Sequence, residues 1–422
     1  MSTLDHAPTG TAAGLRPFVL SDDVLDRFAA RAPEYDREGR FFREDLDELR
    51  DLGYLGLNVP ESVGGHGRTL LETAREQRRL GYRSISTALA VNMHLYWTGT
   101  AADAHRRGDS SLDWVLAEAA AGRVFAAGHG EPANDLGIDD STTRAEPTGD
   151  GGYRFTGHKI FGSLTPAWDW FGLHGRDDSD PEHPKIVHAF VRRDAPGIRI
   201  EERWDTIGLR ATRSEDTHLD GTPAAAQNVA TVLTVGEPSV ADPFVLSLFA
   251  WALVGIGSVY HGLAQRALDV AVAHARTRVS RKNGGAPLAD DPYARHQIAQ
   301  AALELERLEA QLERVASDWS DGVDHGDRWP AKITAAKYQA SESARRVVEL
   351  SSLVVGGASL FRGHELERIY RDVPGAAFHP ASGALTHEIL ALTALGAAEA
   401  GLPPSGAAVR LPHAPLSPTT PS

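Results

Sequence analysis

The stretch PFVLSLFAWALVGIGSVYHGLAQRALDVAVAHARTR, residues 243–278, decides the fold class of this chain. Its first part, residues 243–265, contains no Lys, Arg, Asp or Glu, which is the composition of a membrane span or of a helix inside a protein core. The run begins at Pro243, contains the polar Ser258 and His261, and continues without a break into a charged helical pattern. These features favour the buried central helix of a bundle over a membrane helix.

The helical pattern continues from this stretch towards the C-terminus. Residues 239–400 divide into four long helical segments, separated by the breaks SRKNGGAPLADDP, SDGVDHGDRWP and VVGGASLFRG. Four helices with short connections predict an up-and-down four-helix bundle. Residues 401–422 are rich in Pro and Ser and offer little to bury, which predicts a disordered tail.

The pattern changes on the N-terminal side of the bundle. Residues 125–238 contain short alternating runs such as YRFTGHKIF and KIVHAFVRR, separated by turns, which is typical of a small antiparallel β-barrel or sandwich. Residues 16–124 are helical and are divided by the turn cluster NVPESVGGHG, whereas residues 1–15 are predicted to be disordered. The sequence therefore predicts an α+β fold, mostly α, with a helical domain, a β-domain and a four-helix bundle in that order.

Charge and composition exclude several classes of function. The net charge of -14 makes nucleic acid and anionic membranes poor partners. The chain has no cysteine, which excludes disulfides, thiolate catalysis and Cys-based metal sites. His174, His183 and His188 lack metal-ligand spacing, so no metal site is predicted. Residues 1–15 lack the basic region and apolar core of a signal peptide, so we expect a cytoplasmic protein.

Four motifs, in order and at compatible spacing, resemble the acyl-CoA dehydrogenase superfamily over roughly residues 40–400. GEPANDLG resembles the opening of the family's middle domain, and TTRAEPTGDGGYRFTGHKIFGS resembles the strand pair that follows it. GLAQRALDVAVAHARTR is similar to the main helix of the bundle, with Lys337 at the place of a family lysine on a later helix. GGASLFRGHELERIYRD resembles the Gly-Gly break and the start of the last helix. The three-part order of domains is that of the same family.

This resemblance implies a flavin, FAD or in one branch FMN, held between the β-domain and the bundle with help from a partner subunit. Phe161 would lay its aromatic face on the flavin ring, and Ser163 would bond flavin N5 or O4. Glu131 matches a residue of the family's cofactor loop. The loop departs from the family pattern, because Gly130 replaces a threonine and His129 lies beside it.

The dinucleotide end of the cofactor has its own matching residues. Arg278 matches the family arginine that pairs with the pyrophosphate, and a guanidinium fork suits phosphate oxygens. Gly356 and Gly357 would allow the backbone to approach the dinucleotide closely.

The carboxylate base of the dehydrogenases is missing at both places where the family carries it. One place falls at Pro380 and the other near Ala252. His379 is the obvious substitute, because an imidazole with an ordinary pKa of about 6.5 suits acid–base work near neutrality. A histidine here also resembles the flavin monooxygenases of the superfamily, in which His94 and Ser163 could fill the further catalytic roles.

Three functions stay open on the sequence alone. The first is FAD-dependent dehydrogenation of an acyl thioester, with electrons passing to an electron-transfer flavoprotein. The second is oxygenation of another small molecule by O₂ and reduced flavin from a separate flavin reductase. The third is a degenerate flavin-binding protein without activity. For each function we expect a homodimer or a homotetramer.

Overall fold

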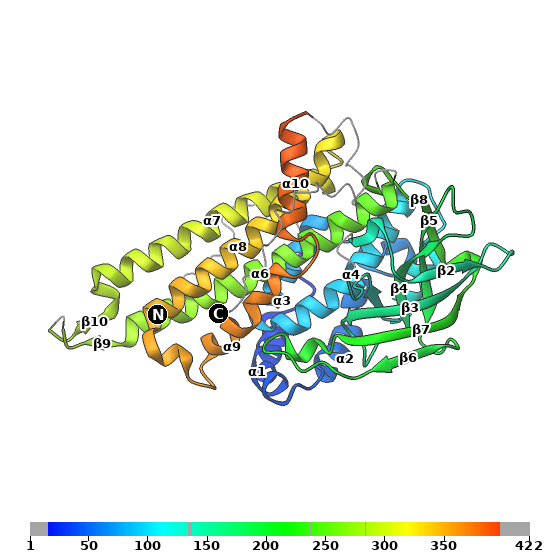
Figure 1. Ribbon diagram of the computed structural model, residues 1–422. Coiled ribbons are helices and arrows are strands. Elements are labelled where there is room, and N and C mark those ends of the chain that lie inside the picture. Colours follow the sequence, from blue (N-terminus) through cyan, green and yellow to red (C-terminus); the bar gives the residue numbers. More distant parts are fainter. Residues whose placement is uncertain (1–15, 134–136, 237–238, 283, 397–422) are drawn as a thin grey trace, which may run out of the picture.

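The order of elements in the computed structural model is helices, strands and helices again (Figure 1). The structure describes residues 16–133, 137–236, 239–282 and 284–396. The two segments predicted to be disordered, 1–15 and 401–422, lie outside the described residues. The predicted α+β fold with a predominance of helix is confirmed.

The N-terminal helices begin and end at signals that the sequence carries. The side chain of Ser21 accepts a hydrogen bond from the first turn of α1, and Gly39 ends this helix in the left-handed conformation. Thr69 and Glu72 form a reciprocal capping box at the start of α3. The helices of this part are α1 (Asp22–Glu38), α2 (Arg43–Asp51), α3 (Leu70–Arg83), α4 (Ile85–Arg106) and α5 (Asp113–Ala120).

The middle of the chain forms one sheet, with β1 paired beside the strand order β6-β7-β3-β2-β4-β5-β8. Most neighbours are antiparallel as predicted, but β4 pairs in parallel with both β1 and β2. The purely antiparallel prediction was wrong on this point, since alternation along a strand does not encode the direction of its partner. The strands are β1 (Phe125–Gly128), β2 (Arg144–Pro147), β3 (Tyr153–Gly162), β4 (Trp170–Asp177), β5 (Lys185–Arg192), β6 (Ile198–Glu201), β7 (Glu215–Ala224) and β8 (Val229–Thr234).

Three long helices lie side by side in the C-terminal part, and the sheet lies towards one end of them (Figure 1). Asp242 and Asp291 cap α6 and α7, each followed by a proline at the first helical position. The fourth helix predicted for the bundle is broken into two short helices by a 3-10 turn that contains Pro374. These helices are α6 (Pro243–Thr277), α7 (Pro292–Ser320), α8 (Trp329–Val355), α9 (Glu365–Asp372) and α10 (Gly383–Ala394).

Helix α6 is the central helix that the opening stretch predicts. It packs against α3, α4, α7 and α8. Within the described ranges it is the one helix long and apolar enough to cross a membrane, and 72% of its most apolar window is buried inside the protein. That burial is the placement expected for a core helix.

Candidate active site

Near the C-terminal end of β3, the loop between β6 and β7 contacts the bundle. Leu209, in the loop between β6 and β7, donates its backbone N–H to the Asp372 carboxylate at the end of α9, at 2.6 Å. A side chain at Gly208 would collide with the backbone of Arg371, and one at Gly375 would collide with Leu209. The loop is thus pressed against residues 371–376, and this contact forms the junction between sheet and bundle.

A row of buried hydroxyl groups leads from the end of β3 into this loop. Ser163 Oγ lies 2.8 Å from Ser214 Oγ, which lies 2.7 Å from Thr212 Oγ1. Thr212 Oγ1 donates to the Leu209 carbonyl oxygen at 2.9 Å. Of these residues, the sequence pointed to Ser163 alone, because the row depends on how two distant segments meet.

Phe161 is presented to solvent at the same strand end. Its side chain is 62% exposed, although it is aromatic, and its backbone has φ +60. A left-handed non-glycine residue costs on the order of 1–3 kcal/mol and persists where the surroundings hold it. Gly130 forms a bridge with Ile160, and a side chain at Gly130 would come within 2.8 Å of the Ile160 carbonyl and 3.4 Å of the Phe161 ring. This bare backbone beside an exposed ring and a hydroxyl row fits the flat face of a flavin.

His379 lies on the bundle side of the junction and pairs with Tyr260 of α6. The His379 Nε2 atom is 2.9 Å from the Tyr260 hydroxyl. Burial, and then the charge of Lys337, lower the pKa of the half-buried His379 below its ordinary value, so the ring is neutral at pH 7. A side chain at Gly375 would come within 2.9 Å of the same hydroxyl, which places Tyr260 next to Leu209 as well.

Lys337 of α8 fixes the segment that carries His379. Its Nζ donates to the carbonyl oxygens of Ala376, His379 and Ala381 at 3.0, 2.7 and 3.2 Å. Burial lowers the pKa of Lys337 to about 8, so it still carries a positive charge near neutrality. In the sequence, Lys337 was singled out only because it matches a family lysine. In the structure it holds the irregular segment 376–381 through three carbonyl oxygens.

His94 lies in the packing between α4 and β1. Its Nε2 lies 2.7 Å from the Leu55 carbonyl oxygen, and its Nδ1 accepts from the Phe125 N–H at 3.1 Å. Both ring nitrogens are therefore engaged by backbone, the side chain is fully buried, and burial lowers its pKa to about 4. His94 thus has a structural place inside the fold, and its ring offers no free nitrogen for the catalytic role predicted for it.

Glu131 forms a buried ion pair with Lys159, with 2.5 Å between Oε1 and Nζ. Burial alone would raise the pKa of Glu131, but Lys159 and the bonded hydroxyl and amide groups lower it to about 2. Its oxygens also accept from the Ser141 hydroxyl and from the N–H groups of Thr142 and Thr143. Since the side chain has no exposed surface, we assign it support of the strand ends instead of the predicted cofactor contact.

Three histidines lie close together in the β-domain, of which His174 and His188 are fully buried and His129 is partly buried. The ring centroids of His129, His174 and His188 are 5.5 to 6.0 Å apart. Burial lowers the pKa of all three, and that of His188 falls to about 3. Among the residues that the structure describes, no group of His, Cys, Asp or Glu has the arrangement of a metal site. The cluster is therefore a set of neutral imidazoles inside the core.

We expect the protein to lose stability as the pH falls below about 6.5. The unfolded chain takes up protons on histidine with a pKa of about 6.5, whereas the folded chain keeps six buried or half-buried histidines neutral, so the unfolded state binds more protons. Four buried or half-buried carboxyl groups with raised pKa oppose this, because they bind protons first in the folded state. The net loss should be about 3–4 kcal/mol between pH 6.5 and 5.5. The histidines are His94, His129, His174, His188, His261 and His379, and the carboxyl groups are Asp45, Glu76, Asp139 and Asp372.

Urea unfolding at several pH values measures this dependence. The variant His188→Leu should show a shallower loss, because one proton fewer is taken up on unfolding. The variant His183→Asn is the control, since the His183 side chain is 70% exposed. A free energy of unfolding that stays level from pH 6.5 to 5.5 would contradict the expectation.

The residues expected to bind the dinucleotide part of FAD lie near the C-terminal end of α6. Arg278 follows the last turn of this helix, and its guanidinium is exposed. Gly356 has φ +73, which favours glycine, whereas a side chain at Gly357 would meet nothing within 4 Å. The structure thus does not bring Arg278 to the Ser163 end of the molecule within one chain, because Tyr260 and Arg278 are separated by about 27 Å of helix.

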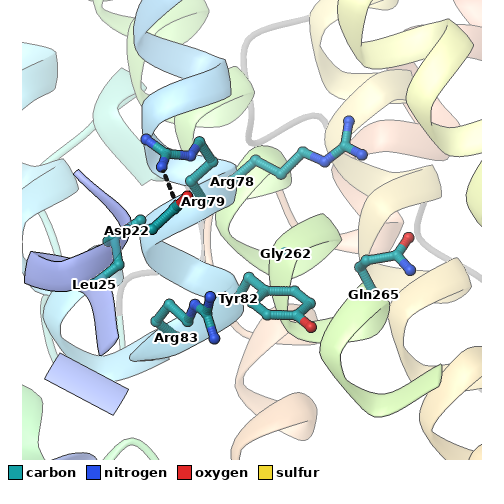
Figure 2. A pocket seen from close by; sticks show the side chains of 8 residues that line it. All are labelled: Asp22, Leu25, Arg78, Arg79, Tyr82, Arg83, Gly262 and Gln265. Carbon is teal, nitrogen blue, oxygen red and sulfur yellow. Dashed lines mark hydrogen bonds and ion pairs between the residues drawn. The ribbon is translucent and has the colours of Figure 1, made fainter. Parts of the chain in front are cut away.

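A separate hollow lies between α1, α3 and α6 (Figure 2). Its arginines are neutralised: Arg79 pairs with Asp22, Arg78 with Glu309 and Arg83 with Asp26. None of the junction residues lines it. We therefore place the candidate site at the junction and not in this hollow.

Comparisons with known proteins identify the family. Residues 243–399 match the family model of the acyl-CoA dehydrogenase C-terminal domain, and residues 22–103 match that of the N-terminal domain. The chain is 30% identical to L-evernosamine nitrososynthase from Micromonospora sp. over 379 residues, covering 87% of each protein. It is 28% identical to L-prolyl-[peptidyl-carrier protein] dehydrogenase from Pseudomonas fluorescens, covering 81% of this chain and 87% of that protein.

Solved structures agree with this assignment. The X-ray structure of KijD3 in complex with FMN and a dTDP-linked amino sugar superposes with a TM-score of 0.79 and 28% identity, covering 89% of this chain and 92% of that one. The chain therefore belongs to the acyl-CoA dehydrogenase family of flavin-dependent oxidoreductases.

Proposed function

We propose that this chain is a flavin-dependent monooxygenase that uses reduced flavin and O₂. The observation that carries the proposal is the neutral His379–Tyr260 pair at the junction, where the family's dehydrogenases have a carboxylate. Both family positions for that carboxylate are occupied by residues without acid–base chemistry, Pro380 and Ala252. Within the described part of the chain, no carboxylate bonds to His379.

The basicity of His379 argues against dehydrogenation of a thioester. The hydrogen next to a thioester carbonyl is a weak acid, so its removal needs a base whose pKa is kept high at the working pH. Burial and Lys337 lower the pKa of His379 instead. A weakly basic imidazole suits instead a hydrogen bond from a substrate N–H, and the transfer of a proton that becomes acidic only as the substrate is oxygenated.

Oxygenation does not require a strong base from the same residues. When bound, reduced flavin would supply the two electrons with which one oxygen atom of O₂ goes to the substrate and the other leaves as water. His379 would then hold the substrate and accept its proton. For that role Nε2–H must donate to the Tyr260 oxygen, which leaves the Nδ1 lone pair available. The segment held by Lys337 keeps this ring in place.

The relatives suggest a class of substrate. A nitrososynthase and a structure with a dTDP-linked amino sugar are both similar to this chain over most of its length. We therefore propose an amine-bearing small molecule as substrate and a separate flavin reductase as partner. The cofactor is then FMN or FAD in its reduced form.

Dehydrogenation of an acyl thioester stays the second candidate. It is favoured by Arg278 and the unobstructed Gly357, which suit the dinucleotide FAD, and by the likeness to a carrier-protein dehydrogenase. An electron-transfer flavoprotein would then be the partner that accepts the electrons.

One pair of experiments distinguishes the two functions. The purified protein is mixed without O₂ with its oxidised flavin and a panel of acyl thioesters, and bleaching of the flavin is recorded. In parallel, reduced FMN or FAD is mixed with O₂ and a panel of amines that includes dTDP-linked amino sugars. Oxygenated product without thioester-dependent bleaching supports the proposal, whereas rapid bleaching by a thioester contradicts it.

The replacement Arg278→Ala tests the dinucleotide contact. We expect it to weaken FAD binding by roughly 1.5–3 kcal/mol, the range for a hydrogen bond to a charged group, and to leave FMN binding unchanged. Flavin fluorescence titration measures both affinities. The neighbouring exposed Arg276→Ala serves as the matched control. Equal loss of FAD and FMN binding would show that Arg278 acts on the fold and not on the pyrophosphate.

We propose that the chain assembles as a homodimer or homotetramer. Arg278 can serve a flavin at Ser163 only from a second copy, because Tyr260, which lies at the junction, and Arg278 are separated by about 27 Å of α6. Leu353, Leu360 and Phe361, which lie near the glycine pair, are 50%, 77% and 73% exposed, and such apolar groups favour a partner surface. Light scattering across a range of concentrations should show a dimer or larger, and an active monomer at all concentrations would contradict this.

A further inference from the structure

The buried hydroxyl row at the junction has a preferred direction, which is set at its Leu209 end. A carbonyl oxygen can only accept, so the 2.9 Å contact between Thr212 and Leu209 uses the one proton of the Thr212 hydroxyl. Thr212 must then accept from Ser214 across 2.7 Å, and Ser214 in turn must accept from Ser163 across 2.8 Å. Each hydroxyl therefore points its proton away from the end of β3.

Water has little access to these hydroxyl groups, so it does not readily reverse the direction of their hydrogen bonds. Thr212 is 0% exposed, Ser214 is 3% exposed and Ser163 is 9% exposed. Reversing the row would lose the bond from the Thr212 hydroxyl to the Leu209 carbonyl oxygen, which would keep only Trp204 Nε1 and the Thr212 N–H as donors, at 3.2 and 3.1 Å. The loss of one such hydrogen bond costs about 0.5–1.5 kcal/mol. The last member, Ser163, is left with lone pairs to offer and no proton to give.

We propose that the row Ser163–Ser214–Thr212–Leu209 selects the reduced flavin, by presenting Ser163 Oγ as a hydrogen-bond acceptor to flavin N5. Reduced flavin carries a proton on N5 and donates there, whereas oxidised flavin has only a lone pair at N5. An acceptor at this place fits the first form and repels the second. The inference rests on the proposed flavin site and deepens it, since it makes Thr212 and Ser214 positioning residues for a cofactor that arrives reduced.

The variant Thr212→Val tests the direction of the row. Valine has nearly the shape of threonine but cannot accept, so the Ser214 hydroxyl is free to turn and donate to Ser163. The Ser163 proton then becomes available to the N5 lone pair of oxidised flavin. We expect the ratio of the affinity for reduced FMN to that for oxidised FMN to fall about tenfold, which lowers the two-electron potential of bound FMN by roughly 30 mV.

Three further variants separate the direction of the row from damage to the fold. Thr212→Ser keeps a hydroxyl and should retain the wild-type ratio. Thr334→Val removes another buried threonine hydroxyl, which donates to the Pro330 carbonyl inside α8, and should leave the ratio unchanged. Ser214→Ala interrupts the row next to Ser163 and should lower the ratio in the same direction as Thr212→Val.

The measurements are anaerobic titrations with oxidised FMN and with dithionite-reduced FMN, together with the potential of bound FMN. Tighter binding of reduced FMN by the wild type, lost in Thr212→Val and kept in Thr212→Ser, supports the inference. A wild type that binds both forms equally, or a ratio unchanged in Thr212→Val and Ser214→Ala, overturns it while the flavin site stands. A wild type that binds neither FMN nor FAD overturns the proposed function itself.

Discussion

Replacing His379 by alanine is expected to slow substrate turnover by about 10²–10⁴-fold, the usual span for the loss of a positioned proton-transfer group. Flavin binding should change little, because the ring that His379 faces is that of Tyr260 and not the exposed Phe161. The loss should therefore appear in kcat more than in the affinity for flavin. Stopped-flow absorbance, with reduced flavin and O₂ in one series and with thioester in the other, measures both steps.

The two functions predict different failures of the His379→Ala protein. As a monooxygenase it should still consume O₂ with reduced flavin, but the oxygen should leave as hydrogen peroxide instead of entering the substrate. As a dehydrogenase it should lose reduction of the flavin by thioester. In that case His379→Glu or Pro380→Glu should recover part of the rate, because each restores a carboxylate close to the vacated position.

The variant Tyr260→Phe is measured beside His379→Ala in the same two series. It keeps the aromatic packing inside the bundle and removes only the hydroxyl that holds His379 Nε2 at 2.9 Å. A smaller loss of rate with the same product pattern would show that Tyr260 orients the imidazole. If His379→Ala equals the wild type in both series, the histidine has a structural role and the site assignment fails.

The sequence predicted the elements whose signals are local. The uncharged run and the proline start of α6 and the turn cluster that divides the N-terminal helices all act over a few residues. The break in the fourth bundle helix has a local signal, Pro374, that the prediction of one continuous helix did not use. The direction of strand pairing around β4 depends instead on packing between distant segments. No periodicity in a single sequence carries that information.

The residues of the candidate site also fall into two groups, those that sequence motifs reveal and those that only the folded structure brings together. Ser163, Phe161 and His379 could be named from their places in motifs, whereas Tyr260 is 119 positions from the histidine it bonds and stands in an apolar run. The sequence assigned no role to Thr212 or Ser214, because the row they form with Ser163 exists only when the two segments meet in space. The histidine-rich core and the burial of His94 become visible only when the strands and α4 are placed in space.

The replacement Lys159→Met is expected to destabilise the protein by about 3–5 kcal/mol, because it leaves the Glu131 carboxylate buried without its counter-charge. Lys159 and Glu131 are both 0% exposed, and the ammonium also donates to the His174 carbonyl at 2.7 Å. Methionine fills a similar volume, so the loss would report the charge and not a cavity. Urea unfolding of wild type and variant at pH 7.5 measures the difference.

Two controls locate the cause of that loss. Arg192→Met removes the exposed pair with Asp194, whose side chains are 60% and 70% exposed, and should cost less than about 1 kcal/mol. The double replacement Lys159→Met with Glu131→Leu removes both buried charges and should recover part of the stability, since apolar residues can substitute for a buried ion pair. Recovery should be partial because Thr142 and Thr143 would keep N–H groups that Glu131 now accepts.

The Lys159→Met variant should also weaken flavin binding, because the Lys159–Glu131 ion pair holds the two strand ends that lie at the border of the candidate site. Glu131 follows Gly130 and Lys159 precedes Ile160, and these two neighbours form the bridge beside Phe161. Loss of the ion pair loosens the backbone that holds the Phe161 ring in place, so the affinity for flavin should fall together with the free energy of unfolding. If Lys159→Met lowers stability and leaves the affinity for flavin at the wild-type value, the pair supports the core of the β-domain alone, and Phe161 is held by its own strand.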